Sequence, residues 1–156
     1  MTTIVCDRNE IAADSQETYD NTKTFSSKKL FRVEREDGEL EIVATAGDSF
    51  AGMKFLQWYE GSEFQDPCTP ELQINDTLLF DWDDDFHILV WNKQGLYEVN
   101  RYFKLIEVRE KFHAVGSGAA VALGAMHMKA TPTEAVQIAK KVDLYTGGKV
   151  ITMELC

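Results

Sequence analysis

The sequence predicts an α+β fold: a sandwich of antiparallel β-sheets with helices packed on its outer faces. Segments with period-two alternation or short apolar runs fill the first third and the middle of the chain. Helical periodicity occurs once after the first strands and twice in succession near the C-terminus. Because this order lacks the regular strand–helix alternation of a parallel sheet, the strands should pair antiparallel.

Four strands are expected before the first helix. Residues 2–7 alternate and are β-branched, and Arg8-Asn9 should turn the chain into a second strand over 10–14. The polar stretch 15–27 shows no core pattern and is expected to be a loop. The next two strands should form a hairpin around Asp37-Gly38, a dipeptide that favours tight turns.

A helix is predicted over residues 48–60, since apolar side chains recur there every three positions. Its expected buried face consists of Phe50, Met53, Leu56 and Tyr59. Residues 61–85 are polar and contain two prolines, so a loop is expected there. Strand chemistry returns in FHILVW, QGLYEVN and YFKLIEV, with NKQG as a turn.

The C-terminal part should contain a short strand in FHAVGSG, two helices and a closing strand in GGKVITMEL. The small-residue segment GAAVALGAMHM predicts the first helix. In TPTEAVQIAKKV, Thr131 and Glu134 form a capping box and Pro132 occupies the first helical position. The expected buried face of this second helix is Ala135, Ile138, Ala139 and Val142. No linker or repeat interrupts the chain, so a single domain over 1–156 is predicted.

Charge and composition exclude several classes of function. The 156 residues carry a formal net charge of −10, which disfavours binding to nucleic acid or an anionic membrane. No segment has the roughly 20 apolar residues of a membrane span, and the N-terminus does not resemble a signal peptide, so a cytoplasmic protein is expected. Three scattered cysteines, Cys6, Cys68 and Cys156, indicate reduced thiols. No cofactor is expected.

Thr2 is a candidate nucleophile. A threonine hydroxyl is weakly nucleophilic and needs a nearby base. If Met1 is removed, Thr2 gains a free α-amine with an ordinary pKa of about 8. This base would belong to the same residue as the hydroxyl and would therefore lie close to it. The alternative is that Thr2 is an ordinary residue at the start of a strand.

Five further motifs occur in order behind Thr2. They are AADSQ, SSKKLFRV, ATAGDSFAGM, AVGSGAAVALGAM and DLYTGGKV. Together with TTIVCD, this set resembles the proteasome β-subunit family of N-terminal nucleophile (Ntn) hydrolases, and is most similar to the bacterial proteasome-like peptidase HslV. The resemblance implies the αββα fold of that family.

The resemblance also implies site residues. It makes Thr2 the nucleophile and assigns further catalytic roles to Asp14, Lys29, Ser117, Asp143 and Thr146. A lysine cation close to Thr2 would lower the pKa of its hydroxyl and amine, and Asp14 would orient that cation. The other three side chains would orient the terminal amine, and backbone N–H groups at the strand-to-helix turn would stabilise an oxyanion.

The activity implied is threonine-type hydrolysis of peptide bonds in unfolded polypeptides by a homo-oligomeric ring, with an ATP-dependent unfoldase as partner. A monovalent or divalent cation held by backbone carbonyls near Lys140, Asp143 and Thr146 is implied as well. Ala44 stands where the family has glycine, so its methyl group is expected beside the substrate strand. That substitution and the retained Met1 fit an alternative, a catalytically silent subunit with a structural or assembly role. A third reading is a small-molecule amidase with the same chemistry.

Two other features are not assigned to the predicted site. The run DWDDDFH over 81–87 is expected to be a solvated acidic loop rather than a cation site, because it lacks the glycine and glutamate positions of a calcium loop. The histidines His87, His113 and His127 share no metal-ligand spacing. His113 is expected in the core or at a sheet edge.

Overall fold

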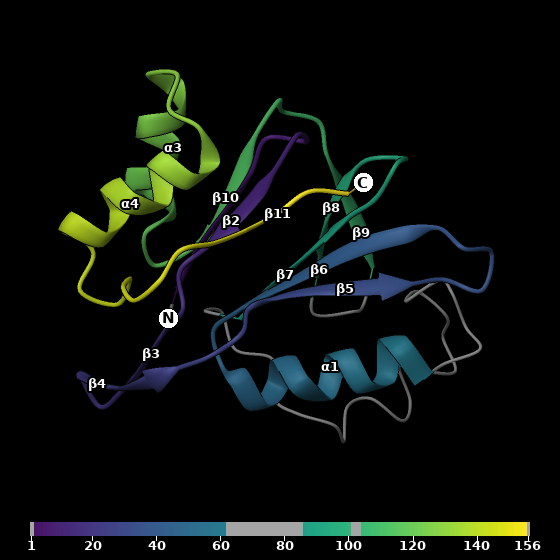
Figure 1. Cartoon of the computed structure of the whole chain (residues 1–156), viewed down its shortest axis with the longest axis horizontal. Helices are drawn as coiled ribbons and strands as arrows, with labels where there is room; N and C mark the ends of the chain where they lie inside the picture. The colour runs from purple at the N-terminus through teal and green to yellow at the C-terminus, as the bar shows by residue number, and fades with distance from the viewer. Residues whose placement is uncertain (1, 62–85, 101–103, 156) are drawn as a thin grey trace.

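Two stacked antiparallel sheets form the centre of the molecule (Figure 1). The computed structural model describes residues 2–61, 86–100 and 104–155. The first sheet has the order β10-β1-β2-β11, with bounds His113–Gly116, Thr3–Cys6, Ile11–Ala13 and Ile151–Met153. The second sheet has the order β5-β6-β7-β8-β9, with bounds Leu30–Glu34, Leu40–Ala46, His87–Trp91, Leu96–Val99 and Leu105–Val108.

Helices cover the outer face of each sheet, as the sequence predicts. The helix α1 (Ser49–Gly61) lies on the second sheet, while α3 (Ala119–His127) and α4 (Pro132–Val142) lie on the first (Figure 1). The predicted α+β sandwich with outer helices is therefore confirmed.

Three apolar clusters match these layers. One lies between the sheets and includes Ile4 and Leu89. The second joins α1 to the second sheet and is centred on Phe55. The third joins α3 and α4 to the first sheet through small residues such as Ala122 and Ala135. Since β1 is buried on both of its faces, its alternating side chains contribute to the first and third clusters, which join the two sheets to each other and the first sheet to α3 and α4.

The expected loop over residues 15–27 is wrong. The chain there forms a hairpin of β3 (Gln16–Tyr19) and β4 (Thr22–Ser26), which extends from the body of the molecule (Figure 1). The turn residues Asp20 and Asn21 have φ of 47° and 60°, a conformation that two-residue hairpins favour. All five residues of β4 are exposed, so no buried face imposes the alternation by which sequence patterns reveal strands.

The predicted face of α1 is partly wrong. Leu56 and Tyr59 are buried as expected, but Met53 is 58% exposed, and the side chain of Phe50 lies outside the described residues. Ala51 and Phe55 complete the buried face. The buried residues Ala51, Phe55 and Tyr59 are thus spaced four apart. The apolar but exposed Met53 obscured this spacing in the sequence.

The second C-terminal helix begins as predicted, but its packing differs. The Thr131 hydroxyl accepts a hydrogen bond from the Glu134 amide, and the Glu134 carboxylate accepts one from the Thr131 amide, which confirms the capping box. Ala135 and Ala139 are buried, whereas Ile138 is 40% exposed and Val142 is 65% exposed. Small side chains face the sheet because α4 packs directly on β1 and β2.

Two turns were correctly predicted. Arg8 adopts φ of 71° in the turn between β1 and β2, and Gly38 adopts φ of 81° between β5 and β6. Most of the polar segment 61–85 and of the acidic run 81–87 lies outside the described residues. Within the described ranges, no helix is long and apolar enough to cross a membrane.

The Glu98 carboxylate contacts one histidine on its own sheet and one on the other sheet. Glu98 on β8 lies 3.0 Å from His87 Nδ1 on β7 and 3.0 Å from His113 Nε2 on β10. His113 belongs to the first sheet, and the other two residues belong to the second. The hydrogen bonds from both imidazoles lower the pKa of Glu98 to about 2. His113 is thus half-buried, at the junction of the sheets.

We expect Glu98→Gln to lower the free energy of unfolding by about 1 kcal/mol near pH 6. Because the pKa of Glu98 is lower in the folded state, its carboxylate stabilises the fold above the unfolded pKa of about 4.3. This contribution is lost as the pH falls towards 2, so the difference between variant and wild type should shrink there. Urea unfolding at several pH values measures it.

The matched control is Glu107→Gln on the neighbouring strand β9. Glu107 lies 3.8 Å from Arg109 in an exposed pair, so its loss should leave stability unchanged. Equal effects of the two substitutions at pH 6 would contradict a role for Glu98 in joining the sheets.

Candidate active site

The six predicted site residues lie at the ends of elements that meet beside the N-terminus. Thr2 precedes β1, Asp14 follows β2, Lys29 precedes β5, Ser117 follows β10, and Asp143 and Thr146 lie between α4 and β11. The structure brings all six into two hydrogen-bonded groups around Thr2. The first group consists of Thr2, Asp14 and Lys29. The second consists of Ser117, Asp143 and Thr146, and Ser117 connects it to Thr2.

Thr2 is held by the antiparallel pairing of β1 with β10. Its neighbour Thr3 pairs with Gly116, which has φ of 99°. A Cβ atom at position 116 would lie 1.9 Å from the Thr2 carbonyl oxygen. Glycine is therefore required at this position by both the backbone conformation and the close approach. Thr2 itself is 1% exposed.

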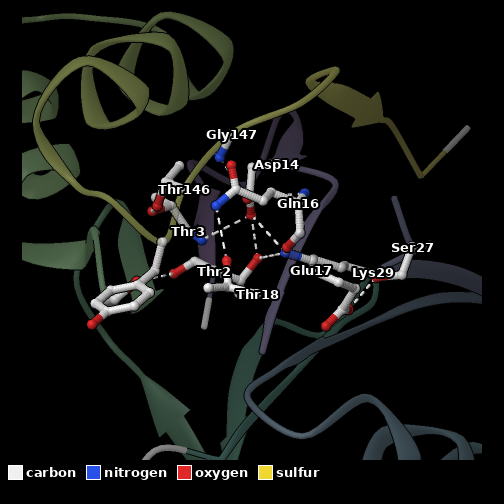
Figure 2. A network of polar contacts seen from close by, with 12 residues as sticks. Thr2, Thr3, Asp14, Gln16, Glu17, Thr18, Ser27, Lys29, Thr146 and Gly147 are labelled. Carbon is white, nitrogen blue, oxygen red and sulfur yellow. Dashed lines mark hydrogen bonds and ion pairs between the residues drawn. The ribbon is translucent and has the colours of Figure 1, made fainter. Parts of the chain in front are cut away.

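The hydroxyl of Thr2 lies between a lysine and a carboxylate (Figure 2). Lys29 Nζ donates a hydrogen bond to Thr2 Oγ1, and Thr2 Oγ1 donates one to Asp14 Oδ1. Lys29 Nζ is also 3.0 Å from Asp14 Oδ1, which closes a three-membered network. The cation thus contacts the oxygen that would have to become a nucleophile.

Backbone amides complete the surroundings of Asp14. Its Oδ1 accepts from the Thr3 amide at 3.0 Å, and its Oδ2 accepts from the amides of Gly147 at 3.0 Å and Gln16 at 3.3 Å. Asp14 is 1% exposed. A buried carboxylate needs such partners, because an unpaired charge in the interior is very unfavourable.

Lys29 is buried as well, at 6% exposure. Its ammonium group donates to the backbone carbonyl of Gln16 at 2.7 Å in addition to Asp14 and Thr2. Burial lowers the pKa of Lys29, and the negative charge of Asp14 opposes that effect. A lysine with a lowered pKa can exchange a proton more readily near neutral pH.

The second group lies on the backbone side of Thr2. Ser117 Oγ is 2.6 Å from Asp143 Oδ2 and 3.4 Å from the Thr2 carbonyl oxygen. Thr146 Oγ1 donates to the same Asp143 oxygen and lies 2.6 Å from Thr3 Oγ1. Asp143 thus collects two hydroxyl groups beside the terminal residues. Ser117 does not cap α3, whose N-cap residue is Gly118.

Solved structures that superpose on this chain include three proteasome-like proteins. BPH from Thiobacillus denitrificans, a bacterial proteasome homologue, shares 23% identity and superposes with a TM-score of 0.69 over 99% of this chain and 98% of that one. HslV from Trypanosoma brucei shares 16% identity, with a TM-score of 0.62 over 98% of each chain. A Gly-1 mutant of Anbu from Hyphomicrobium sp. strain MC1 shares 14%, with a TM-score of 0.72 over 99% of this chain and 82% of that one.

The chain has the proteasome-like Ntn-hydrolase fold. The resemblance that the motifs predicted is therefore confirmed at the level of the fold. No protein-family model and no curated protein matches the sequence.

The expectation for Ala44 is wrong. Ala44 is fully buried in β6, paired with Leu30 on one side and Leu89 on the other, and its methyl group belongs to the cluster between the sheets. It therefore does not lie beside an open substrate strand. The chain leaves β6 for α1 through Gly47, whose φ of 106° makes it the turning point of this proteasome-like strand-to-helix connection.

Sequence reasoning missed the residues that join the two groups. Gln16 and Gly147 contact Asp14 through their amides, and Thr3 contacts both Asp14 and Thr146. Gln16 ends the motif AADSQ, but it stands in a polar stretch without periodicity, so nothing in the sequence indicates its burial at 5% exposure. The GG pair at 147–148 carried a signal, because adjacent glycines after a helix mark a close approach.

The described residues contain no cluster of three or more His, Cys, Asp or Glu side chains that could hold a metal ion. The cation expected near Lys140, Asp143 and Thr146 would use backbone carbonyls instead, and that site stays a prediction.

We expect Gly116→Ala to lower the free energy of unfolding by more than about 2 kcal/mol. The new methyl group would collide with the Thr2 carbonyl at a backbone conformation that alanine rarely adopts. Gly124→Ala in α3 is the matched control, because no atom lies within 4 Å of its added Cβ. It should be neutral or stabilising by up to about 1 kcal/mol. Equal losses in denaturant unfolding would refute the close approach.

We expect Asp14→Asn to lower the pKa of Lys29 further, because it removes the negative charge that opposes the effect of burial. An NMR titration of the lysine side chain measures this. Asp37→Asn, in the exposed β5–β6 turn, should leave that titration unchanged. A Lys29 pKa that rises or stays constant in Asp14→Asn would show that the ion pair does not hold the charge.

Proposed function

We propose that the chain is a threonine-type endopeptidase with Thr2 as an N-terminal nucleophile, formed when Met1 is removed. The observation that carries the proposal is the position of Thr2 Oγ1, which lies between Lys29 Nζ and Asp14 Oδ1 in a buried site at the start of β1. An ordinary threonine at the beginning of a strand has no need of a buried ion pair at its hydroxyl.

The first half of the reaction forms an ester. The Thr2 hydroxyl attacks the carbonyl carbon of a peptide bond, and its proton passes to the free α-amine of the same residue. Lys29 stabilises the developing negative charge on Thr2 Oγ1. The tetrahedral intermediate then breaks the C–N bond, and the protonated α-amine gives its proton to the departing amine.

The second half releases the acyl group. A water molecule loses a proton to the α-amine and attacks the ester carbonyl, and the proton returns to Thr2 Oγ1 as the ester C–O bond breaks. Ser117, Asp143 and Thr146 surround the backbone of Thr2 and orient its amine. Backbone N–H groups of the turn after β6 stabilise the oxyanion in both halves.

The substrate class we propose is the peptide bonds of unfolded polypeptides. The chain would act in the cytoplasm as a homo-oligomeric ring, with an ATP-dependent unfoldase to supply unfolded substrate. The resemblance to HslV and proteasome β-subunits supports this part. One structure of the neighbour BPH from Thiobacillus denitrificans was solved in complex with epoxomicin, so we propose that compound as an inhibitor of this chain.

We expect the working protein to be lighter than the full chain by one methionine residue, because the amide nitrogen of Thr2 cannot act as a base while Met1 is attached. Intact-mass spectrometry tests this directly. The processed form should hydrolyse fluorogenic peptides, and epoxomicin should block that hydrolysis.

In Thr2→Ala we expect the rate to fall by at least about a thousandfold, as for removal of a nucleophile. Thr152→Ala, on the exposed side of β11, should retain full activity. Complete retention of Met1, or equal turnover by Thr2→Ala and wild type, would refute the peptidase. Retained Met1 would instead support the silent subunit, a protein with this fold and an assembly role.

A further inference from the structure

Gln16 connects the two groups of the site. It is the first residue of β3 and is 5% exposed. Its backbone carbonyl accepts the hydrogen bond from Lys29 Nζ at 2.7 Å. Its side-chain Nε2 donates to the carbonyl of Leu144 at 3.1 Å. The same nitrogen donates to Thr18 Oγ1 at 2.9 Å (Figure 2). One residue therefore contacts both the lysine of the first group and the loop that carries the second.

We propose that Gln16 is a positioning residue. Its side chain anchors the start of β3 to the loop 143–147 and so holds the Gln16 carbonyl against the ammonium group of Lys29. The proposal rests on the proposed function, and it extends that function by naming a residue outside the six implied by resemblance.

The fit of the side chain supports an anchoring role. A Cβ on Gly147 would lie 2.0 Å from Gln16 Oε1, so the loop and the amide are packed without space between them. The Gly147 carbonyl also accepts from the Gln16 amide at 3.1 Å. Backbone and side chain of Gln16 thus hold the same loop, and a shift of that loop would move the carbonyl that faces Lys29.

The hairpin supplies little restraint of its own. Among the described residues, β3 pairs with β4 alone, whose residues are all exposed, and the pairing is irregular between Gln16 and Thr18. Within the described part of the chain, β3 therefore lacks the second neighbouring strand that β1 and β6 each have. The position of the Gln16 carbonyl is then set by the Gln16 amide on Gly147 together with the side-chain contacts to Leu144 and Thr18.

The consequence for the chemistry concerns the charge on Lys29. The charged groups that raise the pKa of this ammonium are Asp14, between β2 and β3, and Glu17 on β3. Removal of Met1 would add a titratable α-amine on Thr2, whose hydroxyl accepts a hydrogen bond from Lys29. The neighbouring Lys28 is exposed, and its ammonium group lies over the ring of Phe31. A displaced carbonyl removes one stabilising partner from the buried cation, so Lys29 would lose its proton at lower pH.

The test is Gln16→Met in the processed chain, since methionine keeps the length of the side chain and removes both donors. We expect kcat for a fluorogenic peptide to fall about tenfold, with KM changed less than about twofold. The alkaline limb of the kcat profile should move to lower pH. Gln137→Met, on the exposed face of α4, is the matched control and should change neither.

A merely structural role makes a different prediction. It would lower the temperature of unfolding and the active fraction while the alkaline limb stayed in place, and that result overturns the proposal. Unchanged kcat in Gln16→Met overturns it as well. If Gln16→Met does not fold, Thr18→Val decides, because it removes one anchor at a half-buried position. That variant should move the limb in the same direction by a smaller amount, and an unmoved limb overturns the proposal.

Failure of the proposed function would look different from failure of this inference. Absence of any Thr2-dependent hydrolysis in the wild type would refute the peptidase itself. A wild type that depends on Thr2, with a Gln16→Met variant of unchanged kcat and pH profile, would refute the role of Gln16 alone.

Discussion

The ion pair between Asp14 and Lys29 is the interaction on which the arrangement around Thr2 depends. Both side chains are buried, so neither charge is tolerated without the other and without hydrogen bonds to the remaining lone pairs. The donors to Asp14 come from Thr3, Gln16 and Gly147, three segments distant in sequence. Satisfying one carboxylate therefore places the N-terminus, the β2–β3 connection and the loop before β11 against one another.

The layered core fixes the positions of the elements that meet at Thr2. β1 is central in its sheet and contributes side chains to the apolar clusters on both of its faces. A strand fixed on two faces cannot slip by one residue without moving its whole set of side chains to the wrong side. Thr2 is the residue directly before this strand, and its carbonyl lies against Gly116 of the neighbouring strand. The fold thus uses its most restrained element to hold its first residues.

The sequence predicted the fold class, both C-terminal helices and the six residues that gather at Thr2, because those features depend on local patterns or on motifs kept in order. It did not predict the β3–β4 hairpin, since an exposed ribbon has no buried face to impose a pattern. It misplaced the methyl group of Ala44, whose direction is set by pairing with Leu30 and Leu89. Gln16 was missed for a related reason: its burial results from contacts with residues about 130 positions later.

In the proposed mechanism, the assembly of the site is separate from the generation of its base. The hydroxyl of Thr2 already contacts Lys29 and Asp14 in a chain that begins with Met1, so these contacts do not require a free amine. The proton acceptor, by contrast, exists only after the Met1–Thr2 peptide bond is cut, because an amide nitrogen is not basic. Folding can therefore complete the oriented nucleophile before it becomes reactive. If the proposed function holds, such a site needs no rearrangement of β1 on removal of Met1, and the Met1–Thr2 bond alone decides whether the buried hydroxyl is a nucleophile or a structural hydrogen-bonding group.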